Sequence, residues 1–391
     1  MILSELLSLP LFNNFKQINE TTGLNNEVSG TAIFDWESRE DVKETFNKGE
    51  FVITTLARFK DNNHDKSVLD SLFAVFEQEV SAFAVKKTFS FQLPKDLIDY
   101  ASKKSIPVFV FETTYVDDII YVIKNSLINN SLNNMQLQKL NEILNTTNES
   151  RIKELSMGIN KYFNNNYIFI SSYIGKNSKL IMQSKNAVKD ILSKTDLVYT
   201  LVFGEENLFA IITYSDSQWD IIYSTVEDIK ESLLTFTNQH IGVSSFNNNI
   251  NKSKEAILES IFALASSIIS GSNFVKFNDL HGEKLIYPVL FTTKGINYYN
   301  YVETIFNSHD KEYASDFKKT LLSYIKNSGN INNVAEELYQ HSNTIRYRIK
   351  KIQLLLGIND SYEAHYMMYT YSKLNSYYKV LNEYELNTKP L

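Results

Sequence analysis

The 391-residue sequence contains no cysteine, which excludes disulfide bonds, thiolate metal sites and cysteine nucleophiles. It has only 12 glycines, and none of the glycine-rich phosphate-binding motifs occurs. The six histidines are scattered without the spacing of metal ligands. We therefore expect that the chain binds neither a metal ion nor a cofactor.

Long apolar runs are also missing. No segment approaches the ~20 apolar residues that a membrane helix needs, so no membrane partner is expected. The N-terminus, MILSELLSLPLF, lacks the basic region and cleavage site of a signal peptide. We therefore expect a cytoplasmic protein. With 43% hydrophobic residues the chain can bury folded cores, and its length predicts two or three domains.

Positive charge is scarce over most of the chain. The formal net charge of -6 argues against a protein that coats nucleic acid along its whole length. From Lys311 to Leu391, however, there are 11 basic and eight acidic residues, a net charge of +3. Any affinity for DNA must therefore be local to this C-terminal segment.

Arginine is rarer still, because 34 of the 39 basic residues are lysines. Two of the five arginines, Arg346 and Arg348, lie two residues apart in the same C-terminal segment. The planar guanidinium group can grip a guanine edge or a phosphate with two hydrogen bonds, which a lysine cannot do. Their placement indicates a site where the geometry of the cation matters.

The arginines lie in a predicted amphipathic helix that Ser342 or Asn343 would open. Its apolar residues recur at intervals of four, three and four, which places them along one face: Ile345, Ile349, Ile352 and Leu356. Base edges would be met by Asn343, Thr344, Arg346 and Tyr347. Phosphates would be met by Arg348, Lys350 and Lys351.

Two more helices are predicted before this one. The first spans Phe317 to Ile325, and Asn332 or Asn333 would cap the second. Three helices with a tight turn before the third form a helix-turn-helix, whose third helix lies in a DNA major groove. The alternative from the pattern alone is an ordinary helical bundle with a solvated basic face.

The same C-terminal residues resemble the helix-turn-helix signature of the purine-catabolism regulator (PucR) family of bacterial transcription factors. They are Leu338, His341, Asn343-Thr344, Arg346-Tyr347-Arg348, Lys351 and Leu356-Gly357. Three N-terminal stretches also resemble this family: L-x-x-L-L-x-L-P-L-F, K-G-E-F-V-I-T-T, and L-P-x-D-L-I-x-Y-A followed by I-P-V-F-V-F. The resemblance implies a double-stranded DNA partner, activation of metabolic genes and an N-terminal sensing domain for a small-molecule effector.

Residues 1–128 alternate strands and helices, which predicts an α/β domain with a largely parallel sheet. Ligands of such domains lie at the carboxyl ends of strands. The candidate ligand-binding residues are Glu50, Thr54 and Thr55. In the alternative interpretation, Glu50 belongs to a turn and the threonines are ordinary strand residues.

Residues 129–166 read as a helical linker, and residues 167–275 run strand, helix, strand, strand, helix, strand, helix, as in a ferredoxin-like α+β domain. Phe203 to Asn207 and Ile241 to Ser244 resemble a GGDEF-like domain. Cyclases of that fold need a carboxylate on the first strand for metal ions, where this sequence has Ile170-Ser171-Ser172. We therefore expect a degenerate, non-catalytic domain that serves dimerisation or signal relay.

The chain then continues through a connector, residues 276–311, in which 285–290 would form an edge strand or extended linker. Residues 312–391 form the all-α DNA-binding domain. The leading hypothesis is a sequence-specific transcriptional regulator, not an enzyme, acting as a homodimer or higher homo-oligomer because dimers read two half-sites. The alternatives are a nucleotide-binding or nucleotide-cyclising enzyme centred on Gly204-Glu205-Glu206, and a helix-turn-helix that binds protein.

Overall fold

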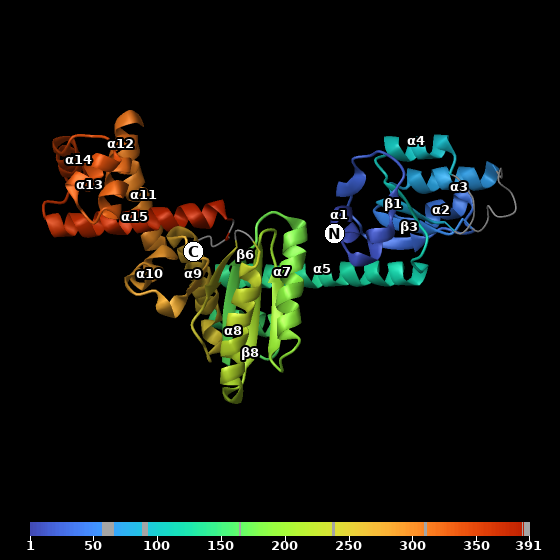
Figure 1. Ribbon diagram of the computed structural model, residues 1–391, viewed down its shortest axis with the longest axis horizontal. Helices are drawn as coiled ribbons and strands as arrows, with labels where there is room; N and C mark the ends of the chain where they lie inside the picture. The colour runs from blue at the N-terminus through green and yellow to red at the C-terminus, as the bar shows by residue number, and fades with distance from the viewer. Residues whose placement is uncertain are drawn as a thin grey trace. The chain divides into compact units, whose positions relative to one another are not determined.

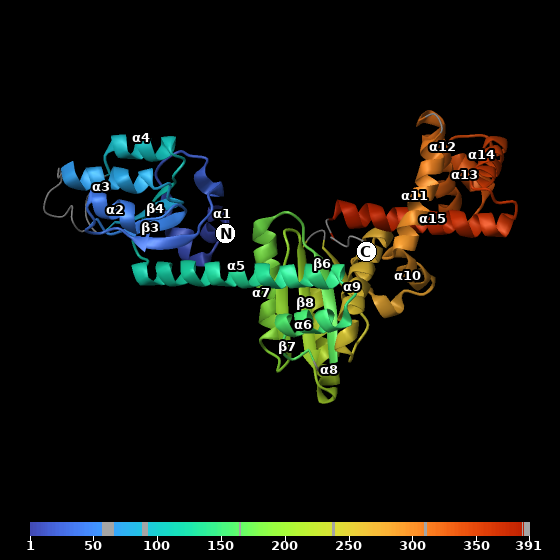
Figure 2. The same cartoon turned by 180° about the vertical axis from the view of Figure 1, so that it is seen from behind.

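The computed structural model describes residues 1–56, 66–87, 93–163, 166–236, 239–308, 311–384 and 386. The chain divides into two compact units, Met1–Met135 and Gln136–Leu391 (Figures 1 and 2). The predicted combination of an α/β N-terminal part with a helical C-terminal part is confirmed. In the described part of the chain, no helix has the length and apolar character to cross a membrane.

The first unit contains a five-stranded sheet in the order β1-β5-β4-β3-β2. Four strands run parallel, and the short β1 runs antiparallel to β5. Their bounds are Lys16–Gln17 (β1), Gly30–Ile33 (β2), Glu50–Thr54 (β3), Ala82–Lys86 (β4) and Val108–Phe111 (β5). The apolar sequence pattern predicts a strand over residues 82–91, of which 88–91 lie outside the described residues.

Helices cover both faces of this sheet, which explains why its central strands are almost entirely apolar. One face packs against α2 (Arg39–Thr45), α3 (Lys66–Glu77) and α4 (Lys95–Lys103). The other packs against α1 (Leu3–Leu7), the 3-10 turn Pro10–Asn14 and the start of α5 (Val116–Asn145). The sequence did not predict α2, which Ser38 opens by accepting a hydrogen bond from the Asp41 amide.

The second unit begins with a mixed sheet in the order β10-β9-β6-β8-β7. The predicted succession of strands and helices is found, and β10, which was not predicted, adds in parallel to β9. The strands are Asn166–Tyr173 (β6), Val198–Phe203 (β7), Asn207–Tyr214 (β8), His240–Val243 (β9) and Phe274–Lys276 (β10).

Two layers of helices enclose this sheet. On one face lie α7 (Ser178–Leu192) and α8 (Trp219–Leu234). On the other lie α6 (Glu149–Ile159), α9 (Ser253–Ser270) and the last turns of α5 (Figure 2). The approach of α9 to β9 requires Gly242, since a Cβ there would stand 2.1 Å from the Leu264 nitrogen. Only glycine admits a backbone this close.

The segment predicted as an edge strand or extended linker is helical, so that expectation was wrong. Gly282–Leu285 forms a 3-10 turn and Tyr287–Leu290 forms α10. Pro288 lies in the first turn of α10, where a missing backbone N–H costs no hydrogen bond. The side chain of Leu290 is fully buried, and this burial favours the helical conformation of the segment over an extended one.

In the described residues after α10 there are five helices: α11 (Thr293–Asn307), α12 (Lys311–Lys326), α13 (Ile331–Glu337), α14 (Ser342–Leu355) and α15 (Ser361–Glu383). They enclose one apolar core. The last helix, α15, also packs against α9, where the ring of Tyr377 stacks on Phe262 at 4.5 Å. The hydroxyl of Tyr377 lies 2.6 Å from Ser266 Oγ, within hydrogen-bond distance. The helical part is therefore anchored to the mixed sheet domain.

Candidate nucleic-acid interface

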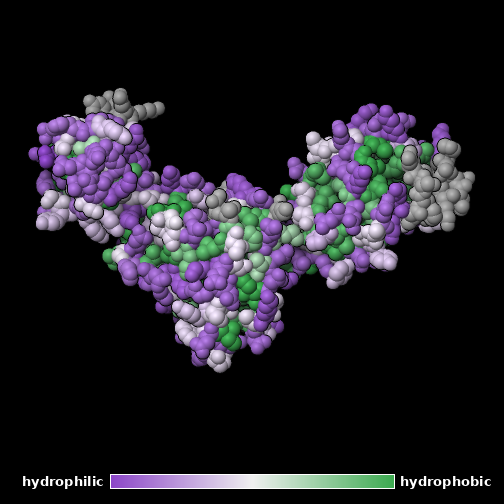
Figure 3. Space-filling model, in the orientation of Figure 1, coloured by the Kyte–Doolittle hydropathy of each residue, from purple (hydrophilic) through white to green (hydrophobic). Residues whose placement is uncertain are grey.

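The helix α14 buries the apolar face that its spacing predicts. Ile345 and Ile352 are fully buried, and Ile349 is nearly so. On the opposite side the ring of Tyr347 is 65% exposed, and Lys350 is exposed as well. In the view of Figure 3 the helical C-terminal part presents a mainly hydrophilic surface. Among the residues that the structure describes, none covers the face of α14 that is predicted to contact DNA.

Both helix caps of the helix-turn-helix differ from the predicted ones. The cap of α13 is Asn330, whose Oδ1 accepts hydrogen bonds from the amides of Asn332 and Asn333 at 3.0 and 3.3 Å. The cap of α14 is His341, whose Nδ1 accepts from the Asn343 amide at 3.2 Å. Each side chain satisfies a backbone donor that the first turn leaves without a partner. The predicted caps lie inside the helices instead.

The turn between α13 and α14 is fixed by its backbone. Tyr339 has a φ of 52°, a left-handed conformation that ends α13. The Gln340 amide then donates to the Ala335 carbonyl at 2.9 Å. Ser342 Oγ donates to Asn332 Oδ1 at 3.1 Å, which ties the first residue of α14 back to α13. The start of α14 is therefore held in a defined position.

Asn343 and Arg346 face solvent one turn apart on α14. The Arg346 Nη1 donates to Asn343 Oδ1 at 3.2 Å. A guanidinium group has five N–H donors, so this bond orients the group and leaves others for a ligand. The predicted base-reading pair is therefore organised before any DNA is bound. Thr344, half-buried, lies on the flank of this face.

Arg348 does not belong to this outward face, and its predicted role as a phosphate contact needs correction. Its side chain is only 17% exposed and forms an ion pair with Asp316 of α12. Its Nη1 also donates to the buried Thr320 Oγ1 at 3.3 Å. Arg348 lies on the side of α14 that faces α12, and it joins these two helices.

Glu337 forms a second junction, between α13 and α12. Its carboxylate accepts hydrogen bonds from Lys326 Nζ at 2.6 Å, Asn327 Nδ2 at 2.6 Å and Ser323 Oγ at 2.7 Å. These bonds, with that from Lys326 the strongest, lower the pKa of Glu337 to about 2. The sequence did not predict this cluster or the partner of Arg348. The local sequence, an Asn- and Gly-containing turn at 327–330, indicated only where one helix ends and the next begins.

Lys350 and Lys351 remain available to an anionic ligand. Lys350 is exposed and Lys351 half-exposed. Within the described ranges neither lysine forms an ion pair. With Arg346 they give the outer side of α14 three cationic side chains, and a positive helix face of this kind attracts phosphate groups.

The candidate ligand residues of the N-terminal unit do not form one site. Glu50 begins β3 and accepts a hydrogen bond from the Asn47 amide at 2.9 Å, whereas Thr54 ends the same strand. Four residues of extended chain separate their backbones by roughly 13 Å. Glu50 therefore closes the turn that leads into β3 and lies at the opposite end of the strand from Thr54.

The two threonines have different surroundings. Thr54 is fully buried, and its hydroxyl accepts from the Leu56 amide at 2.9 Å. Thr55 is half-buried, and its hydroxyl donates to Asp35 Oδ1 at 3.2 Å. Asp35 lies two residues beyond the end of β2 and Thr55 lies one residue beyond the end of β3, so these two polar groups meet at the carboxyl ends of neighbouring parallel strands. This is the usual position of a ligand in such sheets.

In the turn that resembles the GGDEF motif, the Glu206 carboxylate is buried and already paired. Glu206 is 4% exposed and forms an ion pair with Lys176 at 3.0 Å. On the first strand, Ser171 Oγ lies 2.7 Å from Ser260 Oγ of α9, within hydrogen-bond distance. Among the residues that the structure describes, no three His, Asp or Glu side chains are grouped as a metal ion requires.

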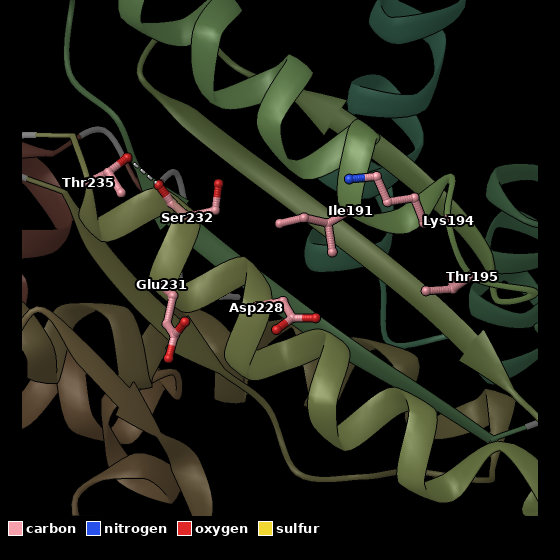
Figure 4. Close-up of a pocket in the computed structure, with 7 residues that line it drawn as sticks. All are labelled: Ile191, Lys194, Thr195, Asp228, Glu231, Ser232 and Thr235. Carbon is pink, nitrogen blue, oxygen red and sulfur yellow. Dashed lines mark hydrogen bonds between the residues drawn. The ribbon is translucent and has the colours of Figure 1, made fainter.

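A hollow of about 610 Å³ lies between α7 and α8, on the outer side of the mixed sheet domain (Figure 4). Lys194 comes from the end of α7, while Asp228 and Glu231 come from α8. All three side chains are exposed. None of the candidate residues lies in this hollow, and the structure gives it no chemistry beyond a mixed charged surface.

Two protein families match separate parts of the chain. Residues 317–365 match the PucR C-terminal helix-turn-helix domain, and residues 5–127 match the purine catabolism regulatory protein-like family. The first match contains all of α13 and α14, with most of α12. The second covers the sheet of the N-terminal unit. Neither of these two matches reaches the mixed sheet.

A curated relative and a solved structure are also similar. The relative is the proline-responsive transcriptional activator PutR of Bacillus subtilis (strain 168), 24% identical over 185 residues. That match covers 45% of each chain, so the chain spans less than half the length of this relative. The structure is a regulator of polyketide synthase expression from Bifidobacterium adolescentis, at 15% identity and a TM-score of 0.31. The structural match covers 65% of this chain and 98% of the solved chain.

Proposed function

We infer that this chain is a PucR-like transcriptional regulator that binds DNA through its helix-turn-helix. Both family matches and the curated relative support this function. The observation that carries it is the exposed face of α14, on which Asn343, Arg346, Tyr347 and Lys350 are presented by a buried apolar stripe. The enzyme alternative receives no support from these comparisons.

In the proposed complex, α14 lies in the major groove with its first turns against base edges. The guanidinium of Arg346 donates to the O6 and N7 of a guanine, the commonest specific contact to DNA. Asn343, already bonded to Arg346, and Tyr347 contact neighbouring bases, with Thr344 on the flank. Lys350 and Lys351 contact phosphates, which position the helix without reading sequence.

The regulator is proposed to act as a homodimer or higher homo-oligomer. One helix-turn-helix contacts few base pairs, and two copies at half-sites one helical turn apart, about 34 Å, gain selectivity. Because the similar PutR protein is a transcriptional activator, activation is the proposed direction of control, and metabolic genes are the proposed targets.

The mixed sheet domain is proposed to be a degenerate GGDEF-like module that relays a signal to the DNA-binding helices. Its support is the contact between α9 and α15. A second contact lies at the end of α15, where the Tyr384 ring packs edge-on against Tyr173 at 4.6 Å. Asn207 Nδ2 also donates to the Tyr384 carbonyl at 3.4 Å. A shift in this sheet would therefore move α15, which packs against α11 and α12 and shares an apolar core with α14.

An effector is proposed to bind the N-terminal unit at the carboxyl ends of β2 and β3, beside Asp35 and Thr55. Their hydrogen bond places a carboxylate and a hydroxyl where parallel sheets hold ligands. A thermal-shift screen of small metabolites tests this site. Stabilisation by a metabolite in the wild type, lost in Asp35→Ala, is the expected result. Equal stabilisation of both proteins would place the effector elsewhere.

Footprinting of genomic DNA with the purified full-length chain tests the proposed function as a whole. Discrete protected sites upstream of genes are expected for the wild type. The double variant Asn343→Ala with Arg346→Ala should lose them, since both side chains are exposed and their removal leaves the fold intact. Absence of protected sites with the wild-type protein, at low salt and across a wide concentration range, would overturn the proposal.

A further inference from the structure

The long helix α5 carries an exposed apolar stripe in its central part. The stripe consists of Tyr121, Ile128, Leu132 and Met135. These residues are 67, 57, 51 and 51% exposed, respectively. At about 100° per residue these four positions lie within an arc of ~60° around the helix. Four large apolar side chains on one face of one helix are more than the single exposed residues that every surface carries.

Other apolar residues of α5 are already packed into the two cores. Ile119 and Ile123 are fully buried in the core of the first unit. Leu140 and Ile143 belong to the core of the second unit. The stripe faces away from Ile119 and Ile123 and ends before Leu140, and its four exposed side chains belong to neither core. Its burial would require another partner.

The stripe has the spacing of a coiled-coil seam. Its members are seven, four and three residues apart, which places Tyr121, Ile128 and Met135 at equivalent heptad positions and Leu132 at the alternate one. The alternate position one heptad before Leu132 is Asn125. An asparagine at such a position pairs with its own copy and favours a parallel, in-register dimer.

The surrounding sequence identifies a second copy of the chain as the fitting partner. From Asn125 to Gln138 there are 14 residues without a single Asp, Glu, Lys or Arg. In a two-fold parallel pair each residue lies beside its own copy, so any charge would meet a like charge. A stretch without charges avoids that repulsion. A partner of different sequence would instead be selected by complementary charges.

We propose that the α5 stripe pairs in parallel with the same stripe of a second copy of this chain. This inference rests on the proposed homo-oligomer and assigns a surface to it. The stripe is about 21 Å long, two heptads, which is less than an independent coiled coil needs. The pair of α5 helices therefore forms one part of the dimer contact, and it sets the two copies side by side with the same polarity.

Cysteine cross-linking tests the contact directly, because the wild-type chain has no cysteine that would interfere. Ile128→Cys in the full-length protein is expected to form a disulfide-linked dimer under mild oxidation. Asn134→Cys is the matched control, since it is exposed on the opposite side of the same helix and should stay unlinked. Equal cross-linking of both variants, or none with Ile128→Cys, would overturn the proposal.

Sedimentation velocity provides a second readout that does not depend on disulfide geometry. Leu132→Glu combined with Met135→Glu is expected to halve the particle mass, while Asn134→Glu should keep the wild-type mass. Both proteins should retain wild-type helix content by circular dichroism, because the changed residues are exposed. A double variant with the wild-type mass would contradict the assigned surface.

DNA binding by the same proteins separates this inference from the proposed function. If the wild type binds DNA and Ile128→Cys fails to cross-link, the proposed α5 contact is wrong and the proposed DNA-binding function is supported. If Ile128→Cys cross-links and the wild type protects no DNA, the proposed α5 contact is supported and the proposed DNA-binding function is wrong.

Discussion

The guanidinium of Arg348 on α14 is paired with the carboxylate of Asp316 on α12. This contact joins two helices whose residues are 32 positions apart in the sequence. It separates the two arginines of the R-Y-R stretch by role, because Arg346 is exposed while Arg348 is largely enclosed. Arg348 therefore joins two helices of the fold, whereas Arg346 is the arginine that is proposed to contact DNA.

Arg348→Ala should loosen the helix-turn-helix. A hydrogen bond to a charged group contributes about 1.5–3 kcal/mol, and the partial exposure of Asp316 favours the lower end, about 1–2 kcal/mol. Local opening of α12 and α14 should then be roughly 5- to 30-fold more frequent, as measured by hydrogen exchange. Arg346→Ala is the control and should leave exchange in both helices unchanged. Equal effects of the two substitutions would contradict the division of roles.

His341→Ala should destabilise the start of α14. The Nδ1 atom of His341 accepts the hydrogen bond of the Asn343 amide, and loss of a helix cap costs about 0.5–2 kcal/mol. Hydrogen exchange of the first turn of α14 should increase, with a matching loss of DNA affinity. His341→Asn, which keeps a capping acceptor, should stay close to wild type. An asparagine variant as unstable as the alanine variant would show that the cap is not the cause.

Acid should weaken the junction between α12 and α13. The pKa of Glu337 is lowered to about 2 in the fold, against about 4.3 for an unfolded glutamate. Its contribution is therefore complete above pH ~4.5 and is lost as the pH falls through about 2. Thermal melts between pH 6 and 2 should show a smaller acid-induced decrease in Tm for Glu337→Gln than for the wild type. Glu336→Gln, at the exposed neighbouring position, should behave like wild type.

Lys350→Ala should weaken DNA binding without changing base preference. A lysine on a phosphate releases about one counterion, so the slope of log K against log salt should decrease by about 1. The measurement is a fluorescence-anisotropy titration at several salt concentrations, on the protected site and on an unrelated duplex. Lys319→Ala, an exposed lysine of α12, is the control. An unchanged slope for Lys350→Ala would remove Lys350 from the phosphate contacts.

The sequence predicted the faces of α14 because apolar periodicity is a local property. Ile345, Ile349 and Ile352 are one turn apart, so their spacing alone places them on one side of the helix. The cap of α14 was missed by one or two residues, because Ser342, Asn343 and His341 can all accept from a first-turn amide. Only the observed backbone selects His341.

Contacts between distant segments could not be predicted in the same way. Asp316 and Arg348 have no fixed spacing, and nothing local distinguishes an arginine that faces a neighbouring helix from one that faces solvent. Glu50 and Thr54 were grouped because they are near in sequence. The rise of an extended strand separates them, and Asp35, from the loop after β2, is the actual neighbour of Thr55.

The most direct test of the account is the base preference of Arg346→Ala. Anisotropy titrations would compare the wild type and the variant on the footprinted site and on versions with each guanine replaced in turn. The wild type should lose about 1–3 kcal/mol of binding free energy when the contacted guanine is replaced. The binding free energy of the variant for the intact site should be weaker than that of the wild type by the same amount. Replacing the guanine should then cause no further loss for the variant. A variant that binds and discriminates like the wild type would contradict the claim that the outer face of α14 reads DNA.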